Sequence, residues 1–166
     1  MFNATTARIG LAALVTALSL TAAQAATTVH VSLWDNGDHA MDPLGQVAPM
    51  GLNMGGDVTN VTMGVRIDAT TVPAGDVTFE VSNASTWAIH EMVVSPAPAT
   101  DQQMPYDTGL IKVIEDQAGH LGEVAELDTG GHGALTLTLS PGTYVLYCNI
   151  PGHYELGMWT TITVTQ

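Results

Sequence analysis

The sequence predicts an all-β protein, and two observations carry that prediction. Short runs of alternating apolar and polar residues recur along the chain, and threonine, valine and aromatic residues are enriched in them. Turn segments that contain both proline and glycine, at 72–76 and 140–142, separate neighbouring runs. About eight short strands at this spacing are typical of a β-sandwich, which is the fold class we expect.

The candidate strands are runs of five to eight residues. They lie at 27–34, 61–68, 77–81, 89–94, 110–114, 134–139, 143–147 and 159–165. A helical interruption is expected only between Ile114 and Asp128, where glutamates accompany Val124 and Leu127. No repeat or linker divides the chain, so we expect one domain over residues 26–166.

The first 25 residues have the pattern of a signal peptide. Arg8 precedes an apolar run at 9–20, which is short for a membrane-spanning helix, and Ala-Gln-Ala at 23–25 is a typical cleavage site. A membrane anchor is the alternative for this segment. We therefore expect an exported, periplasmic protein that is not inserted in the membrane once the signal is cleaved.

The remaining chain is strongly acidic. Arg66 and Lys112 are its only lysine or arginine residues, against sixteen Asp and Glu residues. That balance argues against nucleic acid as a partner, because almost nothing can neutralise phosphates. The acidity is explained either by electrostatic steering of basic partner proteins or by a requirement for solubility.

The only cysteine lies in a motif that is typical of a copper site. Cys148, His153 and Met158 follow one another in the pattern C-x4-H-x4-M, between the last two candidate strands. A thiolate, an imidazole and a thioether suit copper better than magnesium or calcium. A single cysteine forms no internal disulfide, and metal ligation would occupy a thiol that is otherwise vulnerable after export.

A second imidazole would complete a type 1 (blue) copper site, which has two histidines and one cysteine in a plane and a weak axial methionine. Of the six histidines, His30 reads as solvent-facing, and His120 and His132 as loop residues. His90 lies at the edge of a core strand. From its position alone it is either a ligand or a structural histidine.

The motifs resemble those of the cupredoxins, the plastocyanin and azurin family of blue-copper proteins. The resemblance rests on Asn83, on 90–94 (His-Glu-Met-Val-Val) and on 141–158, and it covers roughly residues 61–166. The spacing is most similar to the rusticyanin, auracyanin and sulfocyanin branch. The resemblance implies a Greek-key sandwich, one type 1 copper ion, and His90, Cys148, His153 and Met158 as the metal ligands.

One residue departs from the pattern of that family. Plastocyanins and azurins usually have asparagine directly after the first histidine ligand, where it ties the two ligand segments together, and this chain has Glu91. The usual hydrogen bond is thereby put in doubt. Asn83 and Asn149 are the alternatives for that role.

These features predict an electron carrier and not an enzyme. The expected partners are redox proteins, for example cytochromes or a terminal oxidase. The alternative is a periplasmic copper chaperone or storage protein that uses a long loop at 38–56, which contains His39, Met41, Met50 and Met54. An imidazole and thioethers in one loop could form a second copper site, and surface-loop packing is the competing explanation.

Overall fold

The computed structural model describes residues 26–166, so the predicted signal peptide lies outside the described part. Eleven strands, one helix and one 3-10 turn lie within it. They are β1 (Thr27–Asp35), η1 (Val58–Asn60), β2 (Met63–Ile67), β3 (Thr71–Pro73), β4 (Gly75–Asn83), β5 (His90–Pro96), β6 (Tyr106–Asp107), β7 (Lys112–Val113), α1 (Glu115–Ala118), β8 (Gly122–Leu127), β9 (His132–Leu139), β10 (Gly142–Tyr147) and β11 (Trp159–Thr165).

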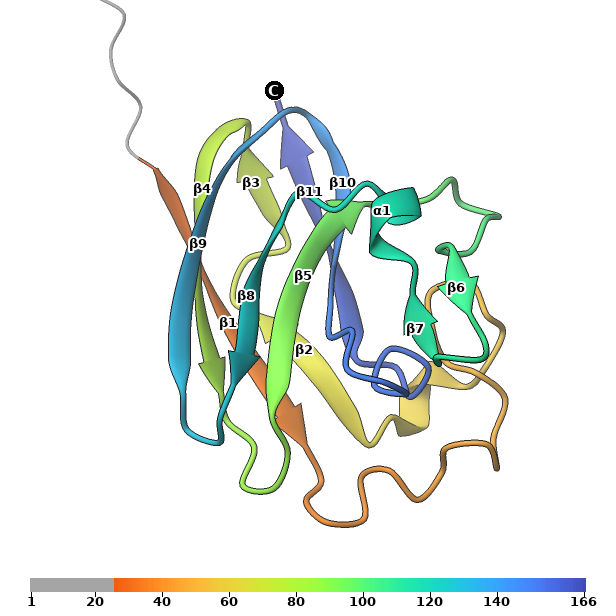
Figure 1. Cartoon of the computed structure of the whole chain (residues 1–166). Helices are drawn as coiled ribbons and strands as arrows, with labels where there is room; N and C mark the ends of the chain where they lie inside the picture. Colours follow the sequence, from red (N-terminus) through yellow and green to blue (C-terminus); the bar gives the residue numbers. More distant parts are fainter. Residues whose placement is uncertain (1–25) are drawn as a thin grey trace, which may run out of the picture.

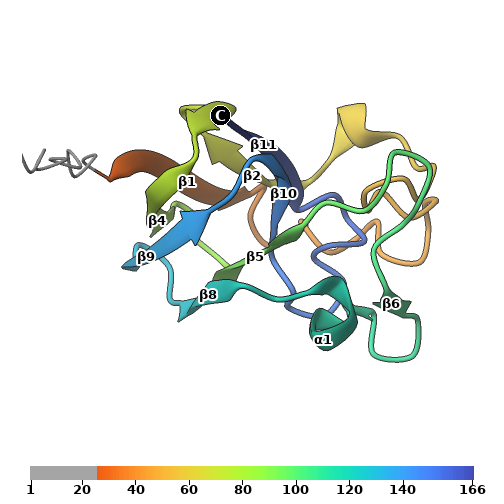
Figure 2. The same ribbon diagram turned by 90° about the horizontal axis from the view of Figure 1, so that it is seen from above.

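The strands form two packed sheets and one small hairpin (Figures 1 and 2). The first sheet has the order β2-β1-β4-β9, the second has the order β3-β11-β10-β5-β8, and β6 pairs with β7. The pairs β1/β4 and β3/β11 are parallel, and the other pairs are antiparallel. The predicted all-β, Greek-key sandwich is confirmed. Within residues 26–166 no helix has the length and apolar character needed to cross a membrane.

Alternation explains why these segments form a sandwich. In β1, Val29, Val31 and Leu33 face inward and are at most 2 % exposed, whereas His30 between them is exposed. Val29 pairs with Phe79 of β4, whose alternate residues are likewise buried. The inward faces of the two sheets thus form one apolar core, which stabilises the sandwich by removing that surface from water.

The sequence predicts about eight strands, which is fewer than the eleven in the structure. β3 and β6 are three and two residues long, too short to show alternation, and they occupy segments that contain proline or turn residues. The predicted strand at 110–114 is reduced to β7, because Ile111 adopts a positive φ of 50° in the preceding turn.

The helical interruption predicted between Ile114 and Asp128 is present as α1, but it is short. The four-residue helix α1 ends at Gly119, which has a φ of 73°, and the chain continues as the edge strand β8. Val124 points into the core while the glutamates of β8 stay near water. Charged residues are common on edge strands because they discourage pairing with other chains.

The predicted long loop at 38–56 lies against the C-terminal ligand loop (orange and dark blue in Figure 1). The backbone N–H of Met50 donates to the carbonyl of Glu155 at 2.7 Å, and the indole N–H of Trp159 donates to the carbonyl of Met50 at 2.8 Å. The N–H of Leu52 donates to the hydroxyl of Tyr154 at 3.0 Å. The loop therefore covers the ligand end of the sandwich.

Candidate metal centre

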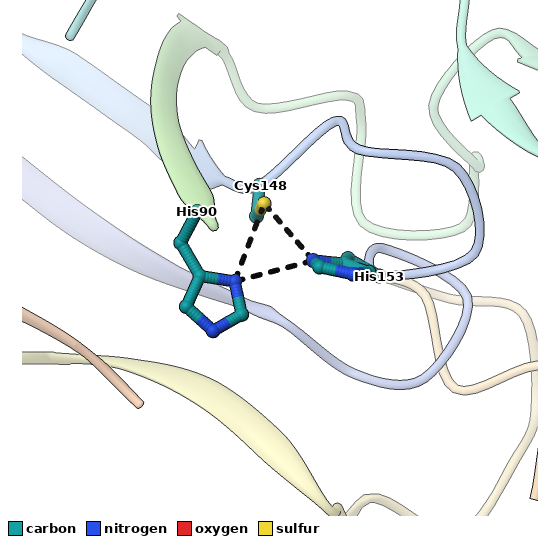
Figure 3. Close-up of side chains that lie close together, drawn as sticks. All are labelled: His90, Cys148 and His153. Carbon is teal, nitrogen blue, oxygen red and sulfur yellow. Dashed lines mark hydrogen bonds between the residues drawn. The ribbon is translucent and has the colours of Figure 1, made fainter. Parts of the chain in front are cut away.

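Three of the predicted ligands converge at the end of the sandwich, as Figure 3 shows. The Nδ1 atoms of His90 and His153 lie 3.2 Å apart, and the sulfur of Cys148 lies 3.4 Å from Nδ1 of His153 and 4.0 Å from Nδ1 of His90. All three residues are buried, with at most 4 % of their surface exposed. One sulfur and two nitrogens thus face a common point.

The C-x4-H-x4-M spacing follows from the hydrogen bonds of the loop between β10 and β11. The N–H of Cys148 donates to the carbonyl of Met158 at 3.1 Å and continues the β10/β11 ladder. The N–H of Met158 donates in turn to the carbonyl of His153 at 3.0 Å. Gly152 allows the tight turn, because its φ is 85° and a Cβ there would meet Leu44 at 2.9 Å.

Met158 is fully buried and belongs to the same apolar cluster as Cys148. Its backbone hydrogen bonds to Cys148 and His153 place it beside both residues. A methionine in this position meets the requirement of a type 1 site for a weak axial thioether.

A buried carboxylate that contacts His90 has no signal in the sequence. Nε2 of His90 lies 3.0 Å from Oδ2 of Asp35, and both side chains are fully buried. When Nε2 carries the proton and donates to Asp35, the lone pair of Nδ1 points to the sulfur and to the second imidazole. Asp35 lies 55 positions from His90 along the chain, so no local pattern connects the two residues.

A hydrogen-bonded loop between β4 and β5 positions both Asp35 and His90. The hydroxyl of Ser85 donates to Asp35, and it accepts the N–H of Trp87 at 2.9 Å. The side chain of Asn83 donates to the carbonyls of Ala88 and Leu127. Asn83 thus orders the residues before His90 instead of linking the two ligand segments.

Glu91 supplies the link that the sequence put in doubt. Its carboxylate accepts the N–H of Asn149 at 3.1 Å, and its own N–H donates to the sulfur of Cys148 at 3.5 Å. The side chain of Asn149 accepts the N–H of Val113 at 2.7 Å and donates to Glu115 at 2.6 Å. The two ligand segments are therefore joined directly, and β7 and α1 are attached to them.

Burial keeps the metal-free ligands neutral. It raises the pKa of the Cys148 thiol to about 12 and lowers that of His153 to about 4, and it also lowers the pKa of His90 despite Asp35. Burial also raises the pKa of Glu91 to about 6. Hydrogen bonds from Ser85, Gly37 and His90 outweigh burial at Asp35 and lower its pKa. Metal binding at this site must therefore release the thiol proton.

The other histidines lie outside this cluster. His30 is exposed and contacts Asp68 at 2.7 Å, as its predicted solvent-facing position requires. His132 begins β9 and is not a loop residue. His120 follows α1 and lies near Glu115 and Glu123 at the surface. These three residues are a second group of neighbouring metal-ligating side chains among residues 26–166.

The methionines of the 38–56 loop pack in two different places. Met50 is buried in the main core and Met41 packs against that core, whereas Met54 packs in a separate cluster that contains Tyr154. His39 is exposed, and its Nδ1 contacts Asp42 at 2.9 Å. This arrangement favours the packing explanation for these residues.

The donor set at His90, Cys148 and His153 fits one type 1 copper ion, the cofactor that the sequence predicts. The sulfocyanin (SoxE) domain matches residues 55–166, which is most of the chain. The chain belongs to the sulfocyanin family. The resemblance to cupredoxins of the rusticyanin, auracyanin and sulfocyanin branch is thereby confirmed.

Individual proteins are similar to this sulfocyanin-family chain in sequence or in fold. Auracyanin-B of Chloroflexus aurantiacus is 45 % identical over 51 residues, which are 30 % of this chain and 22 % of that protein. Reduced auracyanin of Roseiflexus castenholzii covers 86 % of this chain and all of its own length, with a TM-score of 0.51 and 22 % identity. Rusticyanin of Thiobacillus ferrooxidans has a TM-score of 0.54 and 18 % identity, with 85 % of this chain and 79 % of rusticyanin covered.

Proposed function

We propose that this protein is an exported type 1 copper protein that carries single electrons between redox partners. His90, Cys148 and His153 would hold the copper ion, with Met158 as a fourth, weaker ligand. The observation that supports this assignment best is the buried triangle of one sulfur and two Nδ1 atoms, with the outer nitrogen of His90 on Asp35. A bound copper ion would supply a one-electron couple.

The chain's own residues contribute rigidity and electrostatics. His90 is held from the first sheet by Asp35, while Cys148 is joined through Glu91 to the strand that begins with His90. A donor set fixed in this way changes little between two oxidation states, which favours fast electron transfer. The N–H group of Glu91 on the sulfur and the apolar surroundings tune the reduction potential.

The experiment is to add Cu(II) to the mature protein and to record the visible spectrum and a redox titration. We expect an intense thiolate-to-copper charge-transfer band and a reversible one-electron couple. Cys148→Ser should abolish the band because it removes the thiolate, whereas His39→Ala should leave it unchanged. Absence of the band in the unmodified protein would refute the assignment.

We further propose that the partners are basic redox proteins, such as cytochromes or a terminal oxidase, and that the protein acts in the periplasm or outside the cell without membrane insertion. Support comes from the sixteen acidic residues, against Arg66 and Lys112 in residues 26–166, and from the predicted signal at 1–25. Electron transfer that slows as salt is added would support steering by charge.

The copper chaperone or storage alternative depends on the 38–56 loop. We favour the electron carrier because Met50 is buried in the core and Met54 packs in a different cluster from Met41. Titration with Cu(I) distinguishes the two functions. The carrier should bind one copper per chain, while a storage protein should bind more and lose the excess in the variant His39→Ala.

A further inference from the structure

Three of the four tyrosines form a continuous line beside the metal centre. The rings of Tyr147 and Tyr154 meet edge to face, with centroids 5.7 Å apart. The rings of Tyr154 and Tyr106 follow with centroids 6.0 Å apart and an interplanar angle of 37°. These residues form a cluster separate from the main core of the sandwich.

The inner end of this line is attached to two proposed ligands. Tyr147 directly precedes Cys148, and Tyr154 directly follows His153. Both tyrosines are fully buried. The two inner rings are therefore each one residue along the chain from a ligand, and they contact each other through space.

The outer end of the line reaches the surface at Tyr106. This half-buried residue lines an open cavity of about 460 Å³, together with Met54, Met104 and Thr108. Its hydroxyl donates to the carboxylate of Glu155 at 2.7 Å. An electron donor or acceptor that docks here would contact the outermost ring of the line directly.

We propose that Tyr106, Tyr154 and Tyr147 form an electron route between this cavity and the metal centre. One electron would leave the reduced partner at Tyr106 and reach a bound Cu(II) ion, which would become Cu(I), and no atom or proton would move. The inference rests on the proposed function. The occupant of the cavity is a one-electron redox protein with a basic contact surface, because Glu155 lines the cavity of a strongly acidic chain.

Two features distinguish this line from ordinary apolar packing. Each of the three hydroxyls has a defined partner: Ser95 for Tyr147, the N–H of Leu52 for Tyr154, and Glu155 for Tyr106. The rings are thus fixed in orientation, and these hydrogen bonds offset the cost of removing the hydroxyls from water. Electronic coupling falls steeply across gaps without contacting orbitals, so a continuous line of π systems favours this direction over the surrounding aliphatic core.

The test uses a photoactive ruthenium complex attached to an introduced thiol, Thr108→Cys, at the cavity. Cys148 is fully buried, so the complex reacts at position 108 before copper is added. A flash in the presence of a dissolved one-electron acceptor, such as hexaammineruthenium(III), converts the attached Ru(II) to Ru(III), which then takes one electron from Cu(I). The rate at which Cu(II) forms is read from the blue band. Tyr154→Leu and Tyr106→Leu should slow this step several-fold, whereas Tyr154→Phe, which keeps the ring, should retain most of the rate.

A second label distinguishes a route from a general effect on the copper site. The complex attached at Ala134→Cys, on the exposed side of β9, should give a rate that Tyr106→Leu does not change. Equal slowing from both labels, or no slowing from position 108, would overturn the proposal. If Tyr154→Leu fails to fold or to bind copper, the half-buried Tyr106→Leu carries the comparison.

A readout without copper separates this inference from the proposed function. In the metal-free protein labelled at position 108, the oxidised ruthenium should take one electron from Tyr106 while its proton moves to Glu155. Electron paramagnetic resonance should then detect a tyrosyl radical, and Tyr106→Phe should reduce its yield. An unchanged yield would refute contact between the cavity and this ring, whether or not copper binds.

Discussion

The two imidazoles of the metal centre are held in different ways. His90 begins a strand, and its outer nitrogen contacts the buried carboxylate of Asp35 from the opposite sheet. His153 lies in a loop, and the polar contacts of its ring among residues 26–166 are to His90 and Cys148 alone. One ligand is therefore fixed by a side-chain network, and the other by backbone turns.

The two sides of the metal centre therefore depend on different parts of the protein. The Asp35 side of the centre belongs to the sandwich itself. Strand β1 pairs with β4, and the loop before β5 is hydrogen-bonded to Asp35 at the end of β1. The His153 side depends on the turns of its own loop and on the covering loop that contains Met50. We expect the first imidazole to keep its position without metal, and the second to depend more on the metal for its order.

Removal of Asp35 should have the largest effect on this comparison. Asp35→Ala leaves Nε2 of His90 and the hydroxyl of Ser85 without their buried partner. We expect copper affinity to fall by about 10- to 100-fold, the usual cost of losing such a carboxylate contact. Competition with a copper chelator measures the affinity.

The control is Asp35→Asn, which keeps an oxygen that can accept the proton of Nε2. It should bind copper more tightly than Asp35→Ala does. If both variants bind copper as tightly as the unmodified protein, the side-chain network does not hold His90, and the proposed difference between the two imidazoles disappears.

Glu91 connects the two sides, and its replacement should have the next largest effect. Glu91→Ala leaves the buried N–H of Asn149 without an acceptor, which should lower the free energy of unfolding by about 1–3 kcal/mol. Glu91→Gln keeps an accepting oxygen and should lose less. Urea denaturation of the metal-free variants measures the difference, and equal losses would show that charge, and not the hydrogen bond, is responsible.

The proposed ligands are more visible in the sequence than the residues that support them. The C-x4-H-x4-M motif is local, so its three residues are visible in one segment, and alternation located β1, β4 and β9 well. Asp35 has no local signature, because its role arises only when the end of β1 and the start of β5 lie at the same side of the sandwich. β8 was missed since its glutamates mask the single buried residue Val124.

The pH dependence of the metal-free protein provides a finer comparison of the two sides. The pKa of His153 is lowered to about 4, so its contribution to stability is lost as the pH falls from about 6.5 to 4. The pKa of Glu91 is raised to about 6, so its contribution is present at low pH and is lost as the pH rises through 6. The two contributions oppose each other in one pH window.

Glu91→Gln should therefore make the acid side of the stability profile steeper. In that variant the destabilisation by the buried histidines below about pH 6.5 is no longer offset by protonation of Glu91. Urea denaturation between pH 7 and pH 4.5 measures this profile. Over that range the variant should lose free energy of unfolding on the order of 1–3 kcal/mol. Profiles of equal slope for the variant and the unmodified protein would contradict the opposing shifts.

The smallest effect is expected far from the metal centre. Tyr144 lies near the start of β10, and its hydroxyl donates to the carbonyl of Ser140 at 2.8 Å. Tyr144→Phe removes only this hydrogen bond and should lower the free energy of unfolding by about 1 kcal/mol. The blue band and the copper affinity should not change, because no residue of the ligand network contacts that hydroxyl. A shifted band would mean that the distant end of β10 also determines the position of Cys148.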